Sequence, residues 1–192
     1  EYTLVTVADY ILSKTPGVTV SNMSSTKALR DITEAKGESY FASAVGEVNV
    51  VKLMKEKSAV IGGEGNGGII YPELHYGRDA LVGVALLLSY LSETDKSLSE
   101  LKKSYPSYTI TKNKIQLTPE INTDALLEQV KKEFKEYEID TTDGVKIYFD
   151  DEWVHLRKSN TEPIIRLYAE SSNAEKAHEL ASNTMDRIKN LY

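Results

Sequence analysis

The sequence of 192 residues contains no cysteine, which excludes a disulfide framework, a thiolate zinc site and a cysteine nucleophile. It also lacks any unbroken run of about 20 apolar residues, the length that a helix needs to span a bilayer. The most apolar segment, ALVGVALLLSYL at 80–91, is shorter than that and is typical of a buried helix. With 41% hydrophobic and 27% charged residues, the composition is that of an ordinary soluble globular protein.

Positive charge is also scarce. The formal net charge is −6, and acidic residues outnumber lysine and arginine by 13 to 11 in residues 1–106 and by 16 to 12 in residues 107–192. A nucleic-acid-binding surface needs a basic excess, which neither half has. Any bound anion must therefore be held by a local cluster of cationic side chains.

The chain lacks an initial methionine and a signal peptide. A helical pattern starts at the first residues, with one apolar face formed by Leu4, Val7, Ala8, Ile11 and Leu12. A helix at the very start favours a piece cut from a longer chain, although a processed terminus would look the same.

Two rhythms divide the chain. Residues 1–106 alternate helical patterns with short apolar strands, such as SAVI at 58–61, and predict an α/β layered domain. The polar, tyrosine-rich segment YPSYTITKNK marks the boundary. Residues 107–192 predict a small α+β domain, an antiparallel sheet with two helices on one face and a hairpin turn at Asp150 and Asp151.

The segment GGEGNGG at 62–68 holds five of the eleven glycines and formally matches G-x-G-x-x-G. A dinucleotide-binding site needs a helix directly after the last glycine, but here the β-branched and aromatic IIYPEL follows. We therefore interpret the cluster as a strand–loop–strand excursion. Glu64 accepts and Asn66 both donates and accepts hydrogen bonds, which suits vicinal hydroxyls. A flexible turn with solvated side chains is the alternative.

The segment RKSNTEPIIR at 157–166 joins two predicted strands. A phosphate monoester carries about −1.5 to −2 charges and three acceptor oxygens, so it needs cations and convergent donors. The segment offers both: Arg157, Ser159, Asn160, Thr161 and Arg166. It is predicted to bind phosphate, although a polar hairpin turn with surface arginines in salt bridges would have the same sequence.

The histidines give no metal-binding pattern. His75, His155 and His178 lie far apart and show neither H-E-x-x-H nor i,i+4 pairing. His155 alternates with Trp153 on a predicted strand and is interpreted as structural. His75, just after the glycine cluster, could line a binding site.

Together, VIGGEGNGGIIYPELHYGRDALVG and LRKSNTEPIIRLYAE resemble two signatures of the four-domain α-D-phosphohexomutases, over essentially the whole chain. The resemblance implies a sugar-contacting third domain at 1–106 and a phosphate-binding fourth domain at 107–192. In the third domain, Glu64, Gly65 and Asn66 would contact sugar hydroxyls. Gly46 and Glu47, in SAVGEVNVV, would form a further loop of the cleft.

By the same resemblance, the non-transferring phosphate would be held by Arg157, Ser159, Asn160, Thr161 and Arg166. Two departures bear on sugar preference: Asn66 stands where many members have serine, and Gly68 where many have histidine. The sugar, whether glucose, mannose or glucosamine, stays open.

In that family, phosphate moves between O1 and O6 through a phosphoserine in the first domain and a hexose bisphosphate intermediate. Mg²⁺ is held by a D-G-D-x-D-R loop in the second domain, and neither motif occurs in this sequence. The resemblance thus implies that Mg²⁺ and the catalytic serine lie outside this chain. Alone, the chain would bind no cofactor and be inactive.

The expected partners are a hexose phosphate, the bisphosphate and the missing N-terminal domains, in the cytoplasm, without nucleic acid or membrane. Two other functions remain open from the sequence: a stand-alone sugar-phosphate binding module, and a structural or nucleic-acid role for the second domain.

Overall fold

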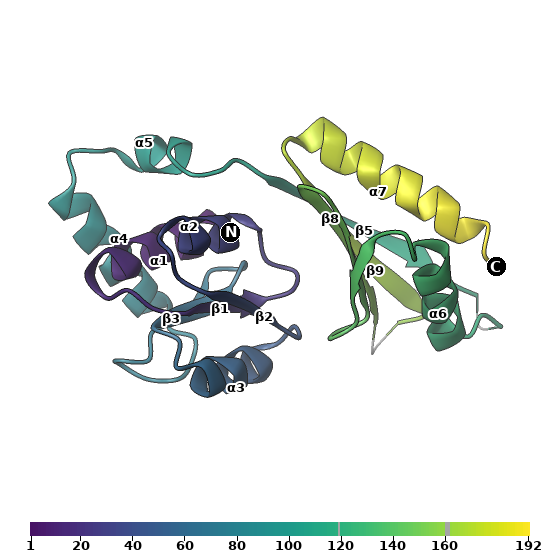
Figure 1. Ribbon diagram of the computed structural model, residues 1–192, viewed down its shortest axis with the longest axis horizontal. Coiled ribbons are helices and arrows are strands. Elements are labelled where there is room, and N and C mark those ends of the chain that lie inside the picture. Colours follow the sequence, from purple (N-terminus) through teal and green to yellow (C-terminus); the bar gives the residue numbers. More distant parts are fainter. Residues whose placement is uncertain (119, 160–161) are drawn as a thin grey trace. The chain divides into compact units, whose positions relative to one another are not determined.

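A computed structural model describes residues 1–118, 120–159 and 162–192. The chain forms two compact units, Glu1–Ser107 (the first unit) and Tyr108–Tyr192 (the second unit). The first contains a mixed sheet with helices, and the second a five-stranded antiparallel sheet with helices (Figure 1). This confirms the predicted fold class, an α/β layer followed by an α+β layer.

The first unit has a four-stranded sheet in the order β2-β1-β3-β4, with β1, β2 and β3 parallel and β4 antiparallel to β3. Helices α1 and α2 lie on one face of this sheet and α3 on the other (Figure 1). The elements of the unit are α1 (Tyr2–Lys14), β1 (Thr19–Asn22), α2 (Ala28–Ala35), β2 (Tyr40–Ser43), α3 (Glu47–Lys57), β3 (Ile61–Glu64), β4 (Gly68–Ile70), α4 (Ala80–Glu93) and α5 (Leu98–Lys103).

The three parallel strands end at one edge of the sheet. Their last residues are Asn22, Ser43 and Glu64, and Asn22 is the direct register partner of Ser43. In open α/β sheets, ligands bind outside the carboxyl ends of the strands. The fold therefore places the start of the glycine cluster at the edge where a binding site is expected.

The predicted strand at 58–61 is wrong in its bounds, because β3 begins only at Ile61 and continues through Gly62 and Gly63. The strand runs through these glycines because the backbone at Gly62 is closely packed. A Cβ atom at Gly62 would lie 2.6 Å from the carbonyl oxygen of Val20 and 2.7 Å from Met54 Sδ. Glycine is thus required inside the sheet as well as in the loop.

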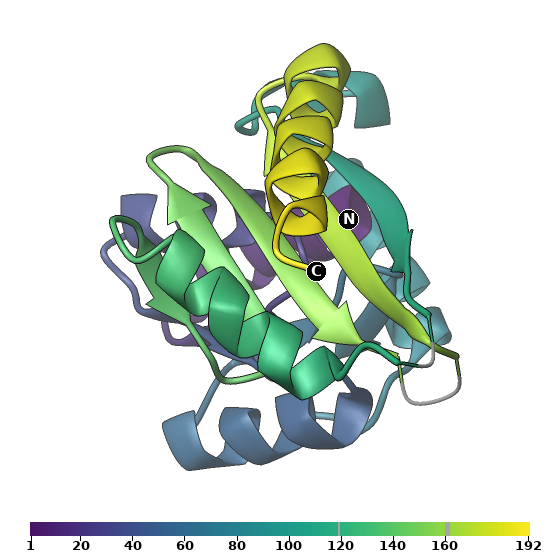
Figure 2. The same cartoon turned by 90° about the vertical axis from the view of Figure 1, so that its right-hand side faces the viewer.

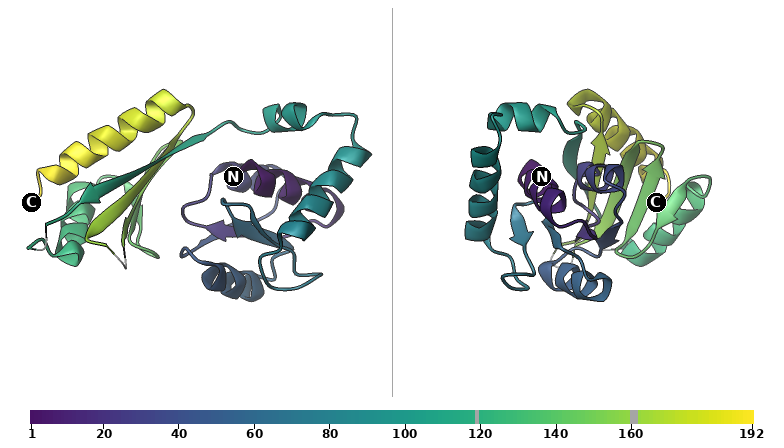
Figure 3. Two further views of the ribbon diagram at one scale, coloured as in Figure 1. Left: turned by 180° about the vertical axis from the view of Figure 1, so that it is seen from behind. Right: turned by 60° about the vertical axis from the view of Figure 1, so that its left-hand side comes forward.

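The prediction that the apolar segment at 80–91 forms a buried helix is also wrong. It forms α4, which lies alongside α1 (Figure 3), but its buried residue is Gly83. Leu81, Val84 and Leu88 are 80%, 53% and 58% exposed. Gly83 packs so closely against β4 that a Cβ atom there would lie 2.7 Å from Ile69 Cγ1. Within the described ranges, no helix is long and apolar enough to cross a membrane.

The second unit has the strand order β5-β9-β8-β7-β6, with every neighbouring pair antiparallel. Helices α6 and α7 cover the same face of this sheet (Figure 2), and their apolar residues form one core with those of the strands. The elements are β5 (Thr109–Gln116), α6 (Thr123–Glu133), β6 (Glu138–Asp140), β7 (Val145–Phe149), β8 (Glu152–Lys158), β9 (Ile164–Ser171) and α7 (Ala174–Lys189).

Alternation along β8 and β9 decides which side chains face away from the helices. Leu156, Ile165 and Leu167 belong to the core beneath α6 and α7. Because successive side chains of a strand point to opposite faces, Arg157 and Arg166 lie on the other face. The predicted hairpin turn is confirmed as well, since it joins β7 to β8 at Asp150 and Asp151, outside both strands.

Candidate functional site

The glycine cluster forms a tight hairpin between β3 and β4. Glu64 is the register partner of Gly68, and the N–H of Gly67 donates a 3.1 Å hydrogen bond to the carbonyl oxygen of Glu64. Gly67 has a φ of +93°, a conformation that residues with side chains rarely adopt. The predicted strand–loop–strand arrangement is thereby confirmed.

Glu64 is buried, with 5% exposure, and both of its carboxylate oxygens are engaged. Asn22 Nδ2, at the end of β1, donates to Oε1 at 2.8 Å. Arg78 Nη1 lies 3.4 Å from Oε2. The carboxylate is therefore fixed at the carboxyl edge of the sheet, where it can accept further hydrogen bonds from hydroxyl groups.

Gly65 and Asn66, which follow Glu64 in the hairpin, differ in their hydrogen bonds. The N–H of Gly65 donates to Ser25 Oγ at 2.9 Å, and its carbonyl oxygen accepts from the amino group of Glu1 at 2.7 Å. Asn66 is exposed, and its Oδ1 accepts from the N–H of Gly68 at 3.0 Å. Among the described residues, Asn66 Nδ2 has no partner, so this amide can donate to a ligand.

Arg78 connects the glycine hairpin to the turn before α3. Its backbone N–H and its Nε both donate to the carboxylate of Glu47, each at 2.9 Å. Both hydrogen bonds lower the pKa of Glu47, and the backbone N–H of Arg78 has the larger effect, followed by its guanidinium. Gly46, with a φ of +117°, is the N-cap of α3 and directly precedes Glu47. We call Asn22, Glu47, Glu64 and Arg78 the edge cluster.

His75 lies beside this cluster. Its Nε2 is 3.1 Å from Asp79 Oδ2, and Asp79 caps α4 by accepting from two backbone N–H groups, which contribute with His75 to a lowered pKa of Asp79. A Cβ atom at Gly77 would lie 3.1 Å from His75 Nδ1 and 3.7 Å from Glu47 Oε1. His75 and Glu47 therefore flank Gly77, and the structure brings these two predicted cleft residues together.

In the second unit, the segment at 157–166 crosses from β8 to β9. Arg157 and Arg166 are direct register partners, and the N–H of Ser159 donates to the carbonyl oxygen of Ile164 at 3.0 Å. Ser159 is buried, with 8% exposure. Asn160 and Thr161, which we also expected to bind phosphate, lie outside the described residues. The two arginines thus share one face of the sheet, close to the connection between β8 and β9.

The two arginines differ in their neighbours. Arg157 Nε lies 2.8 Å from Asp143 Oδ2, an ion pair without the angle of a hydrogen bond. Arg166 is exposed and, within the described part of the chain, has no acidic partner. A salt bridge thus partly neutralises Arg157, as the simple-turn alternative requires, while Arg166 keeps its full charge for an anion.

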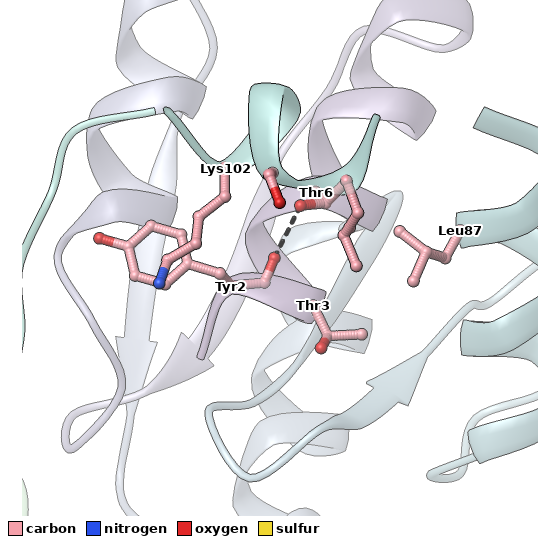
Figure 4. Close-up of a pocket in the computed structure, with 7 residues that line it drawn as sticks. Tyr2, Thr3, Thr6, Leu87 and Lys102 are labelled. Carbon is pink, nitrogen blue, oxygen red and sulfur yellow. Dashed lines mark hydrogen bonds between the residues drawn. The ribbon is translucent and has the colours of Figure 1, made fainter. Parts of the chain in front are cut away.

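A separate hollow of about 260 Å³ lies between α1, α4 and α5 in the first unit (Figure 4). Tyr2, Thr3 and Thr6 line it from α1, with Leu87 of α4 and Lys102 of α5. The Lys102 ammonium lies 5.5 Å from the centroid of the Tyr2 ring, and this cation–π contact stabilises the position of the lysine side chain. No residue of the edge cluster lines this hollow.

Neither unit offers a metal centre among the described residues. No group of three or more histidine, aspartate and glutamate side chains is arranged to hold an ion there. Nor does His155 offer a ligand position: it is 1% exposed, its Nε2 lies 2.6 Å from the carbonyl oxygen of Asp143, and burial lowers its pKa to about 4. The side chains in the described ranges therefore do not fit a Mg²⁺ site.

Sequence reasoning missed Asn22, Arg78 and Asp143. All three act through distant residues, and Asn22 and Glu64 are 42 positions apart. The carboxyl ends of neighbouring parallel strands were the signal that could have identified Asn22, because they meet at one edge. Asp143 comes just before β7, which the predicted hairpin pairs with β8, so the register of that hairpin was the signal that could have identified the contact of Asp143 with Arg157.

Curated relatives resemble most of this chain. It is 38% identical over 180 residues to a phosphoglucomutase/phosphomannomutase of Thermococcus kodakarensis, covering 92% of this chain and 39% of the relative. It is 34% identical over 149 residues to a phosphoglucosamine/phosphogalactosamine mutase of Sulfurisphaera tokodaii, covering 77% and 32%. The chain thus spans about two-fifths or less of the length of these relatives.

Solved structures agree on the fold. A phosphoglucomutase/phosphomannomutase family protein of Burkholderia thailandensis superposes with a TM-score of 0.81 at 23% identity, over 98% of this chain and 41% of that one. An N-acetylphosphoglucosamine mutase of Aspergillus fumigatus, in complex with GlcNAc-6P and magnesium, gives a TM-score of 0.69 at 13% identity, over 97% and 46%.

Two family models match the two units in order. Residues 1–108 match the phosphoglucomutase/phosphomannomutase alpha/beta/alpha domain III, and residues 111–187 match the phosphoglucomutase/phosphomannomutase C-terminal domain. With a mixed sheet in the first unit and an antiparallel sheet in the second, this chain belongs to the phosphoglucomutase/phosphomannomutase family and carries its third and C-terminal domains.

Proposed function

We propose that this chain supplies the sugar-binding and phosphate-binding part of a phosphohexomutase, which reversibly moves phosphate between O1 and O6 of a hexose phosphate. In this proposal the edge cluster and Asn66 contact sugar hydroxyls, and the 157–166 segment binds the phosphate that is not transferred. The placement of Arg157 and Arg166 on one face, beside Ser159, is the observation that carries it.

The first unit has the chemistry that hydroxyl recognition requires. Each sugar hydroxyl donates one hydrogen bond and accepts others, so a site needs fixed acceptors beside fixed donors. Glu64 is a buried acceptor that Asn22 and Arg78 orient, and Asn66 offers an exposed amide. The same arrangement holds no cation that could neutralise a phosphate without first giving up Glu47 and Glu64.

The second unit has the chemistry that phosphate recognition requires. Charge-assisted hydrogen bonds to a phosphate are about twice as strong as neutral ones, and guanidinium forks suit its oxygens. The relatives named for different sugars leave the sugar of this chain open, and Asn66 and Gly68 are where a preference would be decided. Mg²⁺ would have to come from parts of the family's proteins that this chain does not contain.

Calorimetry on the 192-residue chain tests the proposal. We expect glucose 6-phosphate to bind more tightly than either glucose or inorganic phosphate, and Arg157→Ala to weaken it by roughly 10-fold or more. Lys132→Ala, which removes one exposed charge from α6, is the control and should leave binding unchanged. Equal binding of glucose 6-phosphate by Arg157→Ala and the parent chain would mean that the segment is only a turn.

A further inference from the structure

A third cation continues the arginine pair across the sheet. Lys114 of β5 is the direct register partner of Arg166, which is in turn the partner of Arg157 on β8. Lys114, Arg166 and Arg157, which we call the cationic row, therefore cross three neighbouring strands side by side. Partners directly opposite in an antiparallel sheet have Cβ atoms about 4.5–5.5 Å apart, so the row concentrates positive charge.

This row contrasts with the charge of its surroundings. The second half of the sequence has 16 acidic residues against 12 lysines and arginines, so cations there could easily be paired. Arg157 has Asp143 at 2.8 Å, but Lys114 and Arg166 have no acidic partner among the described residues. Like charges directly opposite each other destabilise a sheet. An anion placed over the row would remove this repulsion.

A cleft of about 630 Å³ opens beside two members of the row, Lys114 and Arg166, and it is large enough for a phosphate group. Lys112, Lys114, Glu162, Arg166 and Tyr168 are among the residues that line it. The ammonium of Lys112 lies 5.3 Å from the centroid of the Tyr168 ring, which occupies that lysine with a cation–π contact. Lys114 and Arg166 are the cations left to meet a ligand there.

We propose that Lys114 is a further phosphate-binding residue, which extends the site from the 157–166 segment onto β5. The ligand class is a phosphate monoester, bound between Lys114 and the guanidinium groups of the row. This inference rests on the proposed function and adds a contact from a strand outside both sequence signatures. Lys114 would act as a mobile point charge, whereas the arginines supply geometry.

Titration of the 192-residue chain tests this role, with backbone amide shifts followed by NMR. Inorganic phosphate and glucose 6-phosphate are added at constant ionic strength in chloride. We expect Lys114→Ala to weaken binding roughly threefold to tenfold, since Lys114 is exposed and solvent screens its charge. Lys114→Arg should restore most of it, and Lys132→Ala should match the parent chain.

The outcomes separate this inference from the proposed function. If Arg157→Ala loses binding while Lys114→Ala and Lys132→Ala bind alike, Lys114 is not a ligand and the phosphate site of the 157–166 segment stands. If the parent chain shows no shifts in that segment with either ligand, the proposed function itself fails. If Lys114→Gln binds as well as Lys114→Arg, positive charge at this position is not required and the inference is wrong.

Discussion

Arg157 of β8 and Arg166 of β9 lie directly opposite each other on adjacent antiparallel strands. Repulsion between opposite like charges costs about 0.2–1 kcal/mol in a sheet. We expect Arg166→Leu to raise the free energy of unfolding of the second unit by up to about 1 kcal/mol at low salt. The same change should remove the stabilisation that added phosphate gives, because the anion loses a ligand.

Urea denaturation can measure this unit separately. Trp153, the single tryptophan of the chain, is 1% exposed within it, so its fluorescence reports the unfolding of that unit. Arg187→Leu is a control of opposite sign, because Arg187 pairs with Glu133 and its loss should destabilise. A lower midpoint for Arg166→Leu in phosphate-free buffer would contradict strain between the arginines.

Arg78→Ala should raise the pKa of Glu47 part of the way to its ordinary value. The largest cause of the lowered pKa is the backbone N–H of Arg78, which alanine keeps, and the guanidinium is the next. Carboxylate NMR during a pH titration would follow Glu47 directly. Arg78→Lys retains a charge without the fork and should give an intermediate value. An unchanged pKa in Arg78→Ala would mean that the guanidinium does not hold Glu47 in solution.

The second unit should lose stability as the pH falls from about 6.5 towards 4. Burial lowers the pKa of His155 from 6.5 to about 4, so the folded state stays neutral while the unfolded chain takes up a proton. The contribution is complete above pH 6.5, decreases through this window and amounts to roughly 3 kcal/mol at most. Urea midpoints at several pH values check this.

His155→Gln is the comparison for that experiment. It keeps an N–H group that can donate to the carbonyl oxygen of Asp143, but it does not titrate. Its stability should be lower at pH 7 and depend less on pH across the same window. Parallel curves for the two proteins would show that other groups control the pH dependence.

Gly144→Ala should destabilise far more than Gly37→Ala, although both glycines have a φ of +79°. A positive φ costs an alanine about 1–2 kcal/mol at either site. At Gly144 a Cβ atom would also lie 2.1 Å from the carbonyl oxygen of Leu156, whereas at Gly37 no atom lies within 4 Å.

Thermal unfolding of the two variants, followed by circular dichroism and Trp153 fluorescence, measures the difference. The clash at Gly144 also bears on ligand binding, because Gly144 follows Asp143, the partner of Arg157. Comparable losses in both variants would indicate that β7 can shift away from Leu156 at little cost.

The 192-residue chain alone should bind a hexose phosphate without converting it. Phosphoryl transfer depends on positioning and on a metal that offsets developing charge. The described residues offer no cluster for such a metal. A coupled assay for conversion of glucose 1-phosphate to glucose 6-phosphate should stay at the buffer rate with Mg²⁺ added. Turnover above that rate would overturn the assignment of the catalytic groups to other domains.

Local signals in the sequence predicted local structure well. Glycines between β-branched residues gave the hairpin that presents Glu64, and adjacent aspartates gave the turn before β8. Each feature depends on the conformational preferences of a few consecutive residues. The glycine hairpin and the turn before β8 could therefore be predicted from the sequence alone.

Contacts between distant segments were not predictable in the same way. Lys114 lies opposite Arg166 because of the order and register of β5 and β9, which are far apart in the sequence and whose pairing depends on the whole sheet. The wrong prediction for α4 has a similar cause. The apolar composition of a segment predicts a helix that is buried, but it does not show which neighbouring surface would cover the helix, and in α4 only Gly83 is buried.

Because one apolar side of α4 is exposed, we expect the stability of the first unit to depend on other molecules in the solution. Leu81, Val84 and Leu88 recur at the spacing of one helical face, so a ligand, detergent or second molecule that shields them binds the folded helix and not the unfolded chain. The melting temperature of this unit should accordingly vary with protein concentration and with amphiphiles. A melting temperature measured for this unit would therefore depend on the composition of the whole solution and not on the polypeptide alone.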